Sequence, residues 1–393
     1  MSEEGYLKRK NDIFTKATHG GFDPEQESTW PLVPSIAVTT SFEQIEPGEH
    51  RHFIYTRLKN PTRQVLEKCL AELDNAKYSL CYSSGLGATT AIASILSAGD
   101  HIIAGDEMYG GTARLFKEVF GKFKVETTIV DTRDTKNIEN AIKSNTKLVW
   151  VETPTNPLLK VVDIAKVADI VHKHKDIILV VDNSFMTPYF QQPLNLGADV
   201  SMHSLSKYMN GHIDVVMGAI STNDFDLYEK LRYNQHAMGL SPSPFDCYQV
   251  NRSLKTLPLR MEHHMKSSIA LAKFLEKQPK IEKVIHPGLP SHPQHDLIKK
   301  QCFGTSGMIS FYIKGGLKET KLFIKSLKLI KFAPSFGGYT TTLLVPSLMT
   351  HTTLPEKVKL EYGITDNLIR MTVGFESVDD LIADVSQALE IIK

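Results

Sequence analysis

An acid and a lysine in the middle of the chain are the first residues whose types and spacing suggest chemistry. Asp182 ends the short apolar run 177–181, and Lys207 follows after a stretch long enough for a loop and a second short strand. A lysine amine forms a Schiff base with an aldehyde, and a carboxylate can hold a pyridine nitrogen protonated. The pair is therefore typical of a pyridoxal phosphate site, although taken alone it also fits an acid that caps a turn or a helix.

Hydroxyls and a glycine-bearing turn supply groups that could hold a phosphate. Ser84, Gly85 and Leu86 stand where a predicted strand gives way to a predicted helix. Backbone N–H groups at the start of a helix attract anions, and glycine lets a ligand approach the backbone closely. Ser204 and Ser206 stand beside the lysine and could bond the same phosphate. Without a ligand, these residues would form an ordinary tight turn and a polar surface.

Three further side chains fit a flat ring and an amino-acid carboxylate. Tyr109 lies in the loop 106–112, after a predicted strand, and loops at that end of a parallel sheet face the ligand crevice. Its ring could stack on a cofactor, and Asn156 in the loop 152–157 could bond a ring oxygen. Arg370 interrupts the apolar run 368–375, where its planar fork suits a carboxylate. The alternatives are a packed tyrosine, an asparagine that shapes a turn and a structural ion pair.

The elements that would position these residues alternate between strand and helix over about 200 positions. A helix is predicted after Asn60, which can cap it, with Pro61 in its first position. Predicted strands cover residues 79–82, 101–107, 126–131, 147–152 and 177–181, and further helices cover 84–96, a stretch from about 112, and 164–174. This order predicts an α/β domain with a mostly parallel sheet.

The pattern changes beyond about residue 256. Residues 261–277 predict a long amphipathic helix that bridges two domains, followed by a strand at 307–314, a helix at 317–326, a strand at 368–375 and a final helix at 378–391. This order predicts a smaller α+β domain with an antiparallel sheet. We therefore expect an N-terminal arm (1–55) that contacts a neighbouring subunit, a cofactor-binding α/β domain (56–256) and a C-terminal α+β domain (257–393). A mobile terminus is the alternative for the arm.

Composition narrows the class of protein. The 41% of hydrophobic residues can form a large core, and 45 basic against 44 acidic side chains leave no basic surface for nucleic acid or membrane. Four scattered cysteines have neither the spacing of a metal site nor that of a disulfide framework. We therefore expect no metal site. The sequence has no secretory signal and no apolar run of membrane-spanning length, so we expect a cytoplasmic protein.

Several segments together resemble the transsulfuration (Cys/Met metabolism) family of pyridoxal phosphate enzymes. The likeness runs from about Thr18 to the last helix and includes the segments YTRLKNPTR (55–63), YSSGLGATTA (82–91), DEMYGGT (106–112), ETPTNP (152–157), VVDNSF (180–185), SLSKYMNGH (204–212) and SPSPFDCYQVNRSLKTLPLRME (241–262). Segments 281–295 and 307–317 are particularly similar to the eukaryotic cystathionine γ-lyases of that family. The resemblance implies fold type I, the aspartate aminotransferase-like fold.

The resemblance also implies a role for each candidate residue. Lys207 would carry the cofactor, Asp182 would bond its ring nitrogen and Tyr109 would stack on the ring. The phosphate would be held by Ser84, Gly85, Leu86, Ser204 and Ser206, and by Tyr55 and Arg57 of a neighbouring subunit in a homotetramer built from two dimers. Substrate contacts would come from Arg370, Ser335 and Asn156 at the α-carboxylate, from Arg114 at the distal end, and from Tyr55.

The implied reaction is cleavage of L-cystathionine to L-cysteine, 2-oxobutanoate and ammonia, in cysteine biosynthesis, with hydrogen sulfide as a further possible product. Pro334 stands where γ-lyases usually carry a glutamate, so β-lyase, γ-synthase and O-acylhomoserine sulfhydrylase activities stay open. Other departures are Leu58-Lys59 for Ser-Gly and Ser206 for threonine, while Gly111 in place of cysteine argues against a methionine γ-lyase. From a different class, a catalytically inactive scaffold of the same fold is the remote alternative.

Overall fold

The computed structural model describes residues 5–9, 12–352 and 354–392. Its larger sheet has the strand order β1-β7-β6-β5-β4-β2-β3. All neighbours are parallel except β7, which runs antiparallel to both β1 and β6. The strands are β1 (Tyr78–Tyr82), β2 (His101–Gly105), β3 (Glu126–Val130), β4 (Thr146–Glu152), β5 (Ile178–Asp182), β6 (Val200–Ser204) and β7 (Gly218–Thr222). The predicted α/β domain with a mostly parallel sheet is confirmed.

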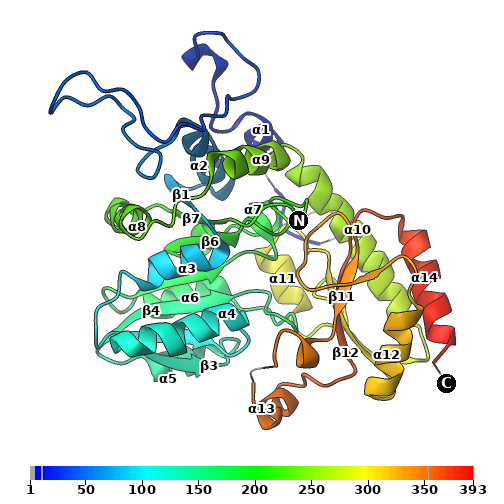
Figure 1. Ribbon diagram of the computed structural model, residues 1–393. Helices are drawn as coiled ribbons and strands as arrows, with labels where there is room; N and C mark the ends of the chain where they lie inside the picture. Colours follow the sequence, from blue (N-terminus) through cyan, green and yellow to red (C-terminus); the bar gives the residue numbers. More distant parts are fainter. Residues whose placement is uncertain (1–4, 10–11, 353, 393) are drawn as a thin grey trace.

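Helices cover both faces of this sheet (Figure 1). One face shares a buried apolar cluster with α3 (Gly85–Ala93), α8 (Phe225–Ala237) and the segment around α4 (Gly110–Arg114). The other face packs against α5 (Thr135–Ala141) and α6 (Ile164–Val171), while α2 (Pro61–Asp74), α7 (Thr187–Phe190) and α9 (Pro244–Leu254) contribute to a third cluster. The sheet core is consequently apolar on both sides, as expected for parallel strands.

The first long helix begins where its sequence predicts. The side chain of Asn60 accepts a hydrogen bond from the backbone N–H of Arg63, and Pro61 occupies the first position of α2. Asn75 ends the helix in the left-handed region, with φ at 52°. Capping at both ends satisfies backbone groups that the helix itself leaves unpaired.

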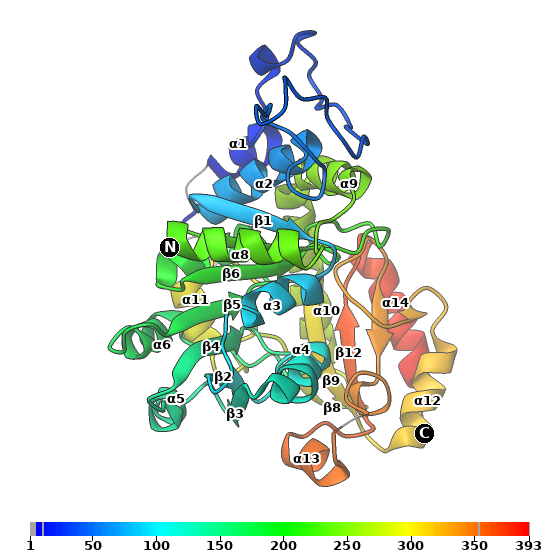
Figure 2. The same ribbon diagram turned by 60° about the vertical axis from the view of Figure 1, so that its left-hand side comes forward.

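The second, smaller sheet has the strand order β10-β11-β12-β9-β8, with β10 and β11 parallel and the other neighbours antiparallel. Its strands are β8 (Ile281–Ile285), β9 (Met308–Ile313), β10 (Lys331–Phe332), β11 (Thr342–Leu344) and β12 (Leu368–Thr372). The helices α10 (Leu257–Glu276), α12 (Leu317–Ser326) and α14 (Val378–Glu390) pack against it (Figure 2). This is the α+β unit that the sequence predicts.

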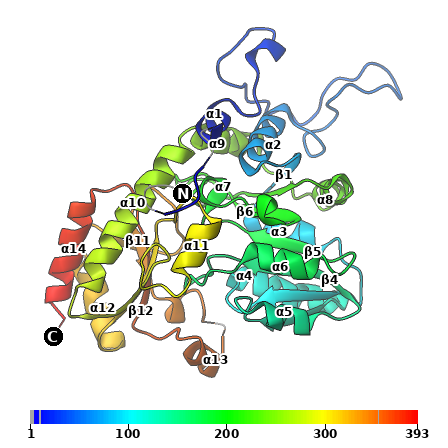
Figure 3. The ribbon, with the colours of Figure 1, turned by 180° about the vertical axis from the view of Figure 1, so that it is seen from behind.

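One long helix and one short helix lie at the border between the two sheets. The long helix α10 crosses from the region of the larger sheet to the outer face of the smaller one, and α11 (His295–Gln301) lies between the two units when the molecule is seen from behind (Figure 3). The helix α13 (Glu356–Glu361) precedes β12 in the chain and lies at the bottom of the view in Figure 1. The domain boundaries given above stay a prediction.

The N-terminal region contains more structure than its sequence suggests. The helix α1 (Asp12–His19) buries Ile13 and Ala17 in a core cluster, although its eight residues are too few for a clear period. Beyond it, the segment to about residue 59 extends away from the body of the molecule (Figure 1). Its few contacts include the isolated bridges Ser41–Tyr55 and Glu46–Glu49. Among the described residues, no helix combines the length and apolarity needed to cross a membrane.

Candidate active site

Lys207 lies in the turn after β6, at the carboxyl end of the sheet. Its Nζ donates a hydrogen bond to Oγ of Ser335, at 2.9 Å. Burial, together with the positive charge of Arg370, lowers the pKa of Lys207 to about 8, against an opposing effect of Asp182. The lysine therefore has an appreciable neutral fraction near physiological pH, as a nucleophilic amine requires.

The turn that carries this lysine is fixed from α10. The guanidinium of Arg260 donates to the carbonyls of Tyr208, at 2.6 Å, and Met209, at 3.0 Å. Gly211 closes the turn with φ at +73°, and a Cβ added there would lie 2.2 Å from Nη1 of Arg260. Glycine is required here both by the left-handed backbone and by the close approach of the guanidinium.

Asp182 ends β5, one strand away from the lysine turn. Because β5 and β6 are parallel and pair as far as Asp182 and Met202, the two residues reach the same edge of the sheet. The buried carboxylate accepts a hydrogen bond from the N–H of Ser184, at 3.0 Å. Burial raises the pKa of Asp182, and the bond from Ser184 opposes that shift. A cationic partner in the pocket, such as a protonated ring nitrogen, would favour the ionised carboxylate.

The predicted phosphate turn is next to the lysine segment. Ser84 caps α3 by accepting a bond from the N–H of Gly87, at 2.9 Å. A Cβ added to Gly85 would lie 3.2 Å from Cβ and Oγ of Ser204, so the turn and this serine are in contact. The first N–H groups of α3, from Gly85 and Leu86, have no intrahelical partner by geometry and can bind an anion.

Ser206, the second serine beside the lysine, has its hydroxyl bonded to the backbone of Met217. Its Oγ donates to the carbonyl of Met217, at 3.2 Å, and accepts from the N–H of the same residue, at 2.9 Å. The hydroxyl proton is thereby used within the protein. Ser204 is the better placed of the two serines for a phosphate.

Tyr109 presents its ring at the surface of this pocket, with 49% of the residue exposed. Its backbone N–H donates to Oε2 of Glu152, at 2.8 Å. A Cβ added to Gly111 would lie 2.5 Å from Cε1 of this ring and 3.1 Å from Cδ1 of Leu86. The ring therefore rests on a glycine and keeps a large apolar face open for stacking.

Arg370, on β12, is a buried guanidinium whose five N–H donors are only partly paired. It donates from Nη1 to Oδ1 of Asn156, at 2.9 Å, and from Nη2 to the carbonyl of Ser335, at 2.7 Å. Its buried Nε has no hydrogen-bond partner among the described residues. Burial lowers the pKa of Arg370 to about 10, so it stays charged at neutral pH. An incompletely paired, buried cation fits an anionic ligand.

The backbone of Ser335 lies in the left-handed region, with φ at +88°. This conformation, uncommon for a residue with a side chain, accompanies a carbonyl bonded to Arg370 and a hydroxyl bonded to Lys207. One residue thus joins the two cationic groups of the pocket. Pro334, just before it, is exposed.

Three predicted site residues lie apart from this group. Arg57 donates from Nη1 to the carbonyl of His236, at 2.7 Å, and its Cζ lies 5.6 Å from the ring centroid of Tyr55. Arg114 is exposed at the end of α4. Within the described chain, no hydrogen bond or ion pair joins any of the three to Lys207, Asp182 or Arg370.

One acid at this site was missed from the sequence. Glu152 ends β4, pairs in register with Asp182 and holds the N–H of Tyr109. Burial, with the nearby charge of Asp182, raises the pKa of Glu152 well above its ordinary value. The signal was present, because Glu152 ends a predicted strand in the same way as Asp182 does.

The residues present fit pyridoxal phosphate. A primary amine of lowered pKa, a buried acid, a helix start beside a serine hydroxyl and a half-exposed tyrosine correspond to its aldehyde, ring nitrogen, phosphate and ring face. The spare donor of Arg370 corresponds to the carboxylate of an amino acid. Amino-acid chemistry at a pyridine ring is what this set of groups can support.

Comparison with known proteins agrees with this geometry. The family model described as Cys/Met metabolism PLP-dependent enzyme matches residues 14–390. The chain is 52% identical over 390 residues to cystathionine gamma-lyase of Sus scrofa (99% of this chain, 96% of the relative) and 48% identical to that of Dictyostelium discoideum (96% and 97%). Among solved structures, metB from Corynebacterium glutamicum has a TM-score of 0.91 at 42% identity (96% of this chain, 97% of that one). Cystathionine gamma-lyase from Lactobacillus plantarum, complexed with L-serine, has a TM-score of 0.92 at 37% identity (97% and 99%).

Proposed function

We propose that this chain, which belongs to the family of Cys/Met metabolism PLP-dependent enzymes, hydrolyses L-cystathionine at its γ carbon–sulfur bond. The products would be L-cysteine, 2-oxobutanoate and ammonia, with one water consumed. Pyridoxal phosphate is the cofactor, as the family description states. The identity of about half of all positions with curated cystathionine gamma-lyases along the full length supports this choice of reaction within the family.

The single observation that carries the proposal is the position of Ser335 between Lys207 and Arg370. Arg370 would hold the substrate carboxylate bidentately, with Asn156 keeping the guanidinium in place. Because Ser335 meets both Arg370 and Nζ of Lys207, an amino acid held in this way would have its α-carbon within reach of the lysine. A carboxylate site that is fixed next to a proton-accepting amine is the arrangement that an α-amino-acid substrate requires.

When bound, pyridoxal phosphate supplies an electron-poor ring that accepts the electron pair left by a departing α-proton. Nζ of Lys207 would take that proton from the α-carbon, give it up again, and then take a proton from the β-carbon, which allows the γ-sulfur to leave. Its lowered pKa suits an amine that both accepts and returns protons near neutral pH. Asp182 would favour the protonated ring nitrogen, and Tyr109 would cover the ring and assist proton transfer.

The remaining residues support the proposed shared site. Tyr55 and Arg57 lie in the extended segment and, among the described residues, have no hydrogen bond or ion pair to Lys207, Asp182 or Arg370 of their own chain, which is expected if they serve the phosphate site of a second copy. We place them there within a homotetramer of two dimers. Four buried free thiols suit a reducing compartment, which supports a cytoplasmic location.

Product analysis with L-cystathionine tests the reaction. Cysteine with 2-oxobutanoate is the expected result. Homocysteine with pyruvate would show cleavage on the β side instead, the second candidate, which is favoured by one observation: Pro334 occupies the position next to Ser335 where γ-lyases carry a glutamate. A protein that binds the cofactor but turns over no amino acid would indicate the scaffold alternative. Release of sulfide from L-cysteine measures the further product separately.

A further inference from the structure

Two loops that follow neighbouring strands carry groups assigned above to the ring and to the substrate. The tyrosine loop (106–109) follows β2 and presents Tyr109, and the asparagine loop (153–160) follows β4 and presents Asn156 to Arg370. β2 and β4 are paired and parallel, so the loops leave the sheet side by side. Their relative position sets the distance between the stacking ring and the carboxylate site.

Two neighbouring carboxylates, of Asp106 and Glu107, join the two loops. Glu107, in the tyrosine loop, forms an ion pair between its Oε1 and Nζ of Lys160, at 2.5 Å, and accepts a hydrogen bond from Oγ1 of Thr155 at Oε2, at 2.7 Å. Nζ of Lys160 also reaches Oδ2 of Asp106, at 3.0 Å. Every one of these contacts crosses from one loop to the other.

The asparagine loop is also closed by two hydrogen bonds between its own residues Thr155 and Lys160. The N–H of Thr155 donates to the carbonyl of Lys160, at 2.9 Å, and the N–H of Lys160 donates to Oγ1 of Thr155, at 3.0 Å. Asn156 therefore lies inside a short closed segment whose two ends both contact Glu107. A shift of the carboxylate would move the whole segment.

Burial makes this connection stiff. The side chains of Glu107 and Lys160 are 1% and 12% exposed, respectively. Burial raises the pKa of Glu107, whereas the charge of Lys160 lowers it. A buried charge that loses its partner is strongly destabilising, so neither loop can slide away from the other.

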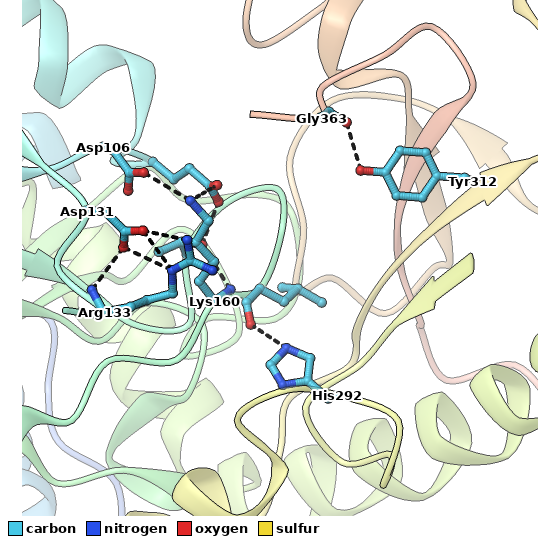
Figure 4. Close-up of polar contacts among 10 residues, drawn as sticks. Asp106, Asp131, Arg133, Lys160, His292, Tyr312 and Gly363 are labelled. Atoms are coloured by element: carbon cyan, nitrogen blue, oxygen red, sulfur yellow. Dashed lines mark hydrogen bonds and ion pairs between the residues drawn. The ribbon is translucent and has the colours of Figure 1, made fainter. Parts of the chain in front are cut away.

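Lys160 also faces the second domain. Its Nζ lies 5.5 Å from the ring centroid of Tyr362, and a cleft of about 320 Å³ between the two domains is lined by residues of both, Lys160 among them. Figure 4 shows Lys160 bonded to Asp106 on the large-domain side, opposite Tyr312 and Gly363. Among the described residues, no hydrogen bond or ion pair joins Lys160 to Lys207, Asn156 or Arg370, so any effect on the reaction must pass through the loops.

We propose that Lys160 is a positioning residue: its ion pair with Glu107 holds Tyr109 and the Asn156–Arg370 pair at the spacing that an amino acid bound to the cofactor needs. The proposal rests on the proposed function only in assigning these loops to the cofactor and the substrate. It assigns Lys160 an effect on substrate affinity although it touches neither molecule.

The test compares Lys160→Met, Lys160→Arg, the double variant Glu107→Gln/Lys160→Met and the control Lys143→Met. Lys143 forms an ion pair with Glu126 of similar length, 3.1 Å, but both side chains are about half exposed. Each cofactor-loaded protein is titrated with L-alanine, followed by the change in cofactor absorbance, and its visible circular dichroism is recorded. The kcat and KM for L-cystathionine are measured alongside.

In Lys160→Met we expect the affinity for L-alanine to fall about tenfold or more, because small misplacements of a binding group carry losses of this size. The dichroism should change with the ring contact, and KM should rise by a larger factor than kcat falls. Lys160→Arg should recover most of the affinity, and Lys143→Met should match the wild type.

The double variant removes both charges of the Glu107–Lys160 pair but leaves Asp106, whose side chain is 10% exposed, without Lys160. A triple variant that adds Asp106→Asn removes that charge as well, so it should fold even if the single variant does not. If it binds L-alanine as tightly as the wild type, the pair serves stability alone and the proposal is overturned. Because L-alanine binding needs no carbon–sulfur cleavage, a wild type that fails to cleave L-cystathionine would refute the proposed reaction and leave this test intact.

Discussion

The pocket around Lys207 and the extended N-terminal segment differ in how much of their surroundings one chain supplies. In the pocket, the amine, the guanidinium and the buried acid all have partners within the chain. On the segment, Trp30, Leu32 and Val38 are 65%, 89% and 71% exposed, respectively. Large apolar side chains left this exposed are typical of surfaces that a partner covers. One chain thus supplies the partners of the pocket residues, whereas the extended segment leaves large apolar side chains that a second copy would cover.

The largest expected effect is within the pocket. Lys207→Ala should lower kcat for L-cystathionine by about 10²–10⁴-fold, the usual contribution of a positioned acid or base. Loss of the yellow cofactor absorbance on dialysis should accompany it, because no amine remains to hold the aldehyde. Lys143→Ala is the exposed control. Near-normal turnover by Lys207→Ala would show that the chemistry lies elsewhere.

Arg57→Ala tests the other half of the comparison. Alone it should be nearly inactive through weak cofactor binding. If the two halves belong to different copies, mixing it with Lys207→Ala under conditions of subunit exchange should restore about a quarter of the wild-type activity, since half of the dimers would be mixed and each would contain one intact site. Mixing that restores nothing, although exchange is shown by mass, would place Arg57 in the site of its own chain.

Arg370→Lys retains the charge but removes the planar fork. The loss of one charge-assisted hydrogen bond, about 1.5–3 kcal/mol, corresponds to roughly a 10–100-fold rise in KM. The exposed pair of Arg232 and Glu229 offers a matched control in Arg232→Lys. An unchanged KM for L-cystathionine would mean that the carboxylate binds to another group.

The pH dependence of cofactor capture reports the charge of Lys207. Only the neutral amine attacks an aldehyde, so capture of pyridoxal phosphate by the apo-protein should accelerate as pH rises, with its midpoint at about pH 8, and level off above it. Arg370→Met removes a positive charge that lowers the pKa of Lys207, and the midpoint should therefore move to higher pH. A midpoint unchanged by this substitution would contradict the electrostatic link between the two residues.

The smallest effect concerns Arg114, which is exposed at the end of α4. If it meets the distal carboxylate of L-cystathionine, Arg114→Ala should lose only about 0.2–1 kcal/mol, as is typical of an exposed ion pair, which corresponds to a rise in KM of roughly 1.4- to fivefold. The affinity for L-alanine, which has no distal end, should stay the same. Equal loss for both ligands would argue for a structural role.

The sequence predicts those parts of the fold that depend on local pattern. The helix α12 has the predicted ends, and Asn60 caps α2 as expected, because capping and amphipathic period are local properties. Lys207 and Asp182 could be brought together from sequence, since parallel strands present their carboxyl ends at one edge of the sheet. The family description confirms the pyridoxal phosphate prediction.

Other features depend on contacts between distant segments. The left-handed backbone of Ser335 and the Glu107–Lys160 pair have no local signal, because each is stabilised by residues far away in the sequence. The direction of the Ser206 hydroxyl is set by Met217, on the approach to β7. The helix α1 is too short for periodicity and is stabilised by packing against the core.

The positive φ of Ser335 places stability and activity in opposition at one residue. A left-handed conformation costs a residue with a Cβ about 1 kcal/mol, a strain that glycine would not have. Ser335→Gly should therefore tolerate heat at least as well as the wild type while losing the hydroxyl that meets Lys207. Directed evolution for thermal stability would tend to remove this serine, whereas selection for turnover would tend to restore it.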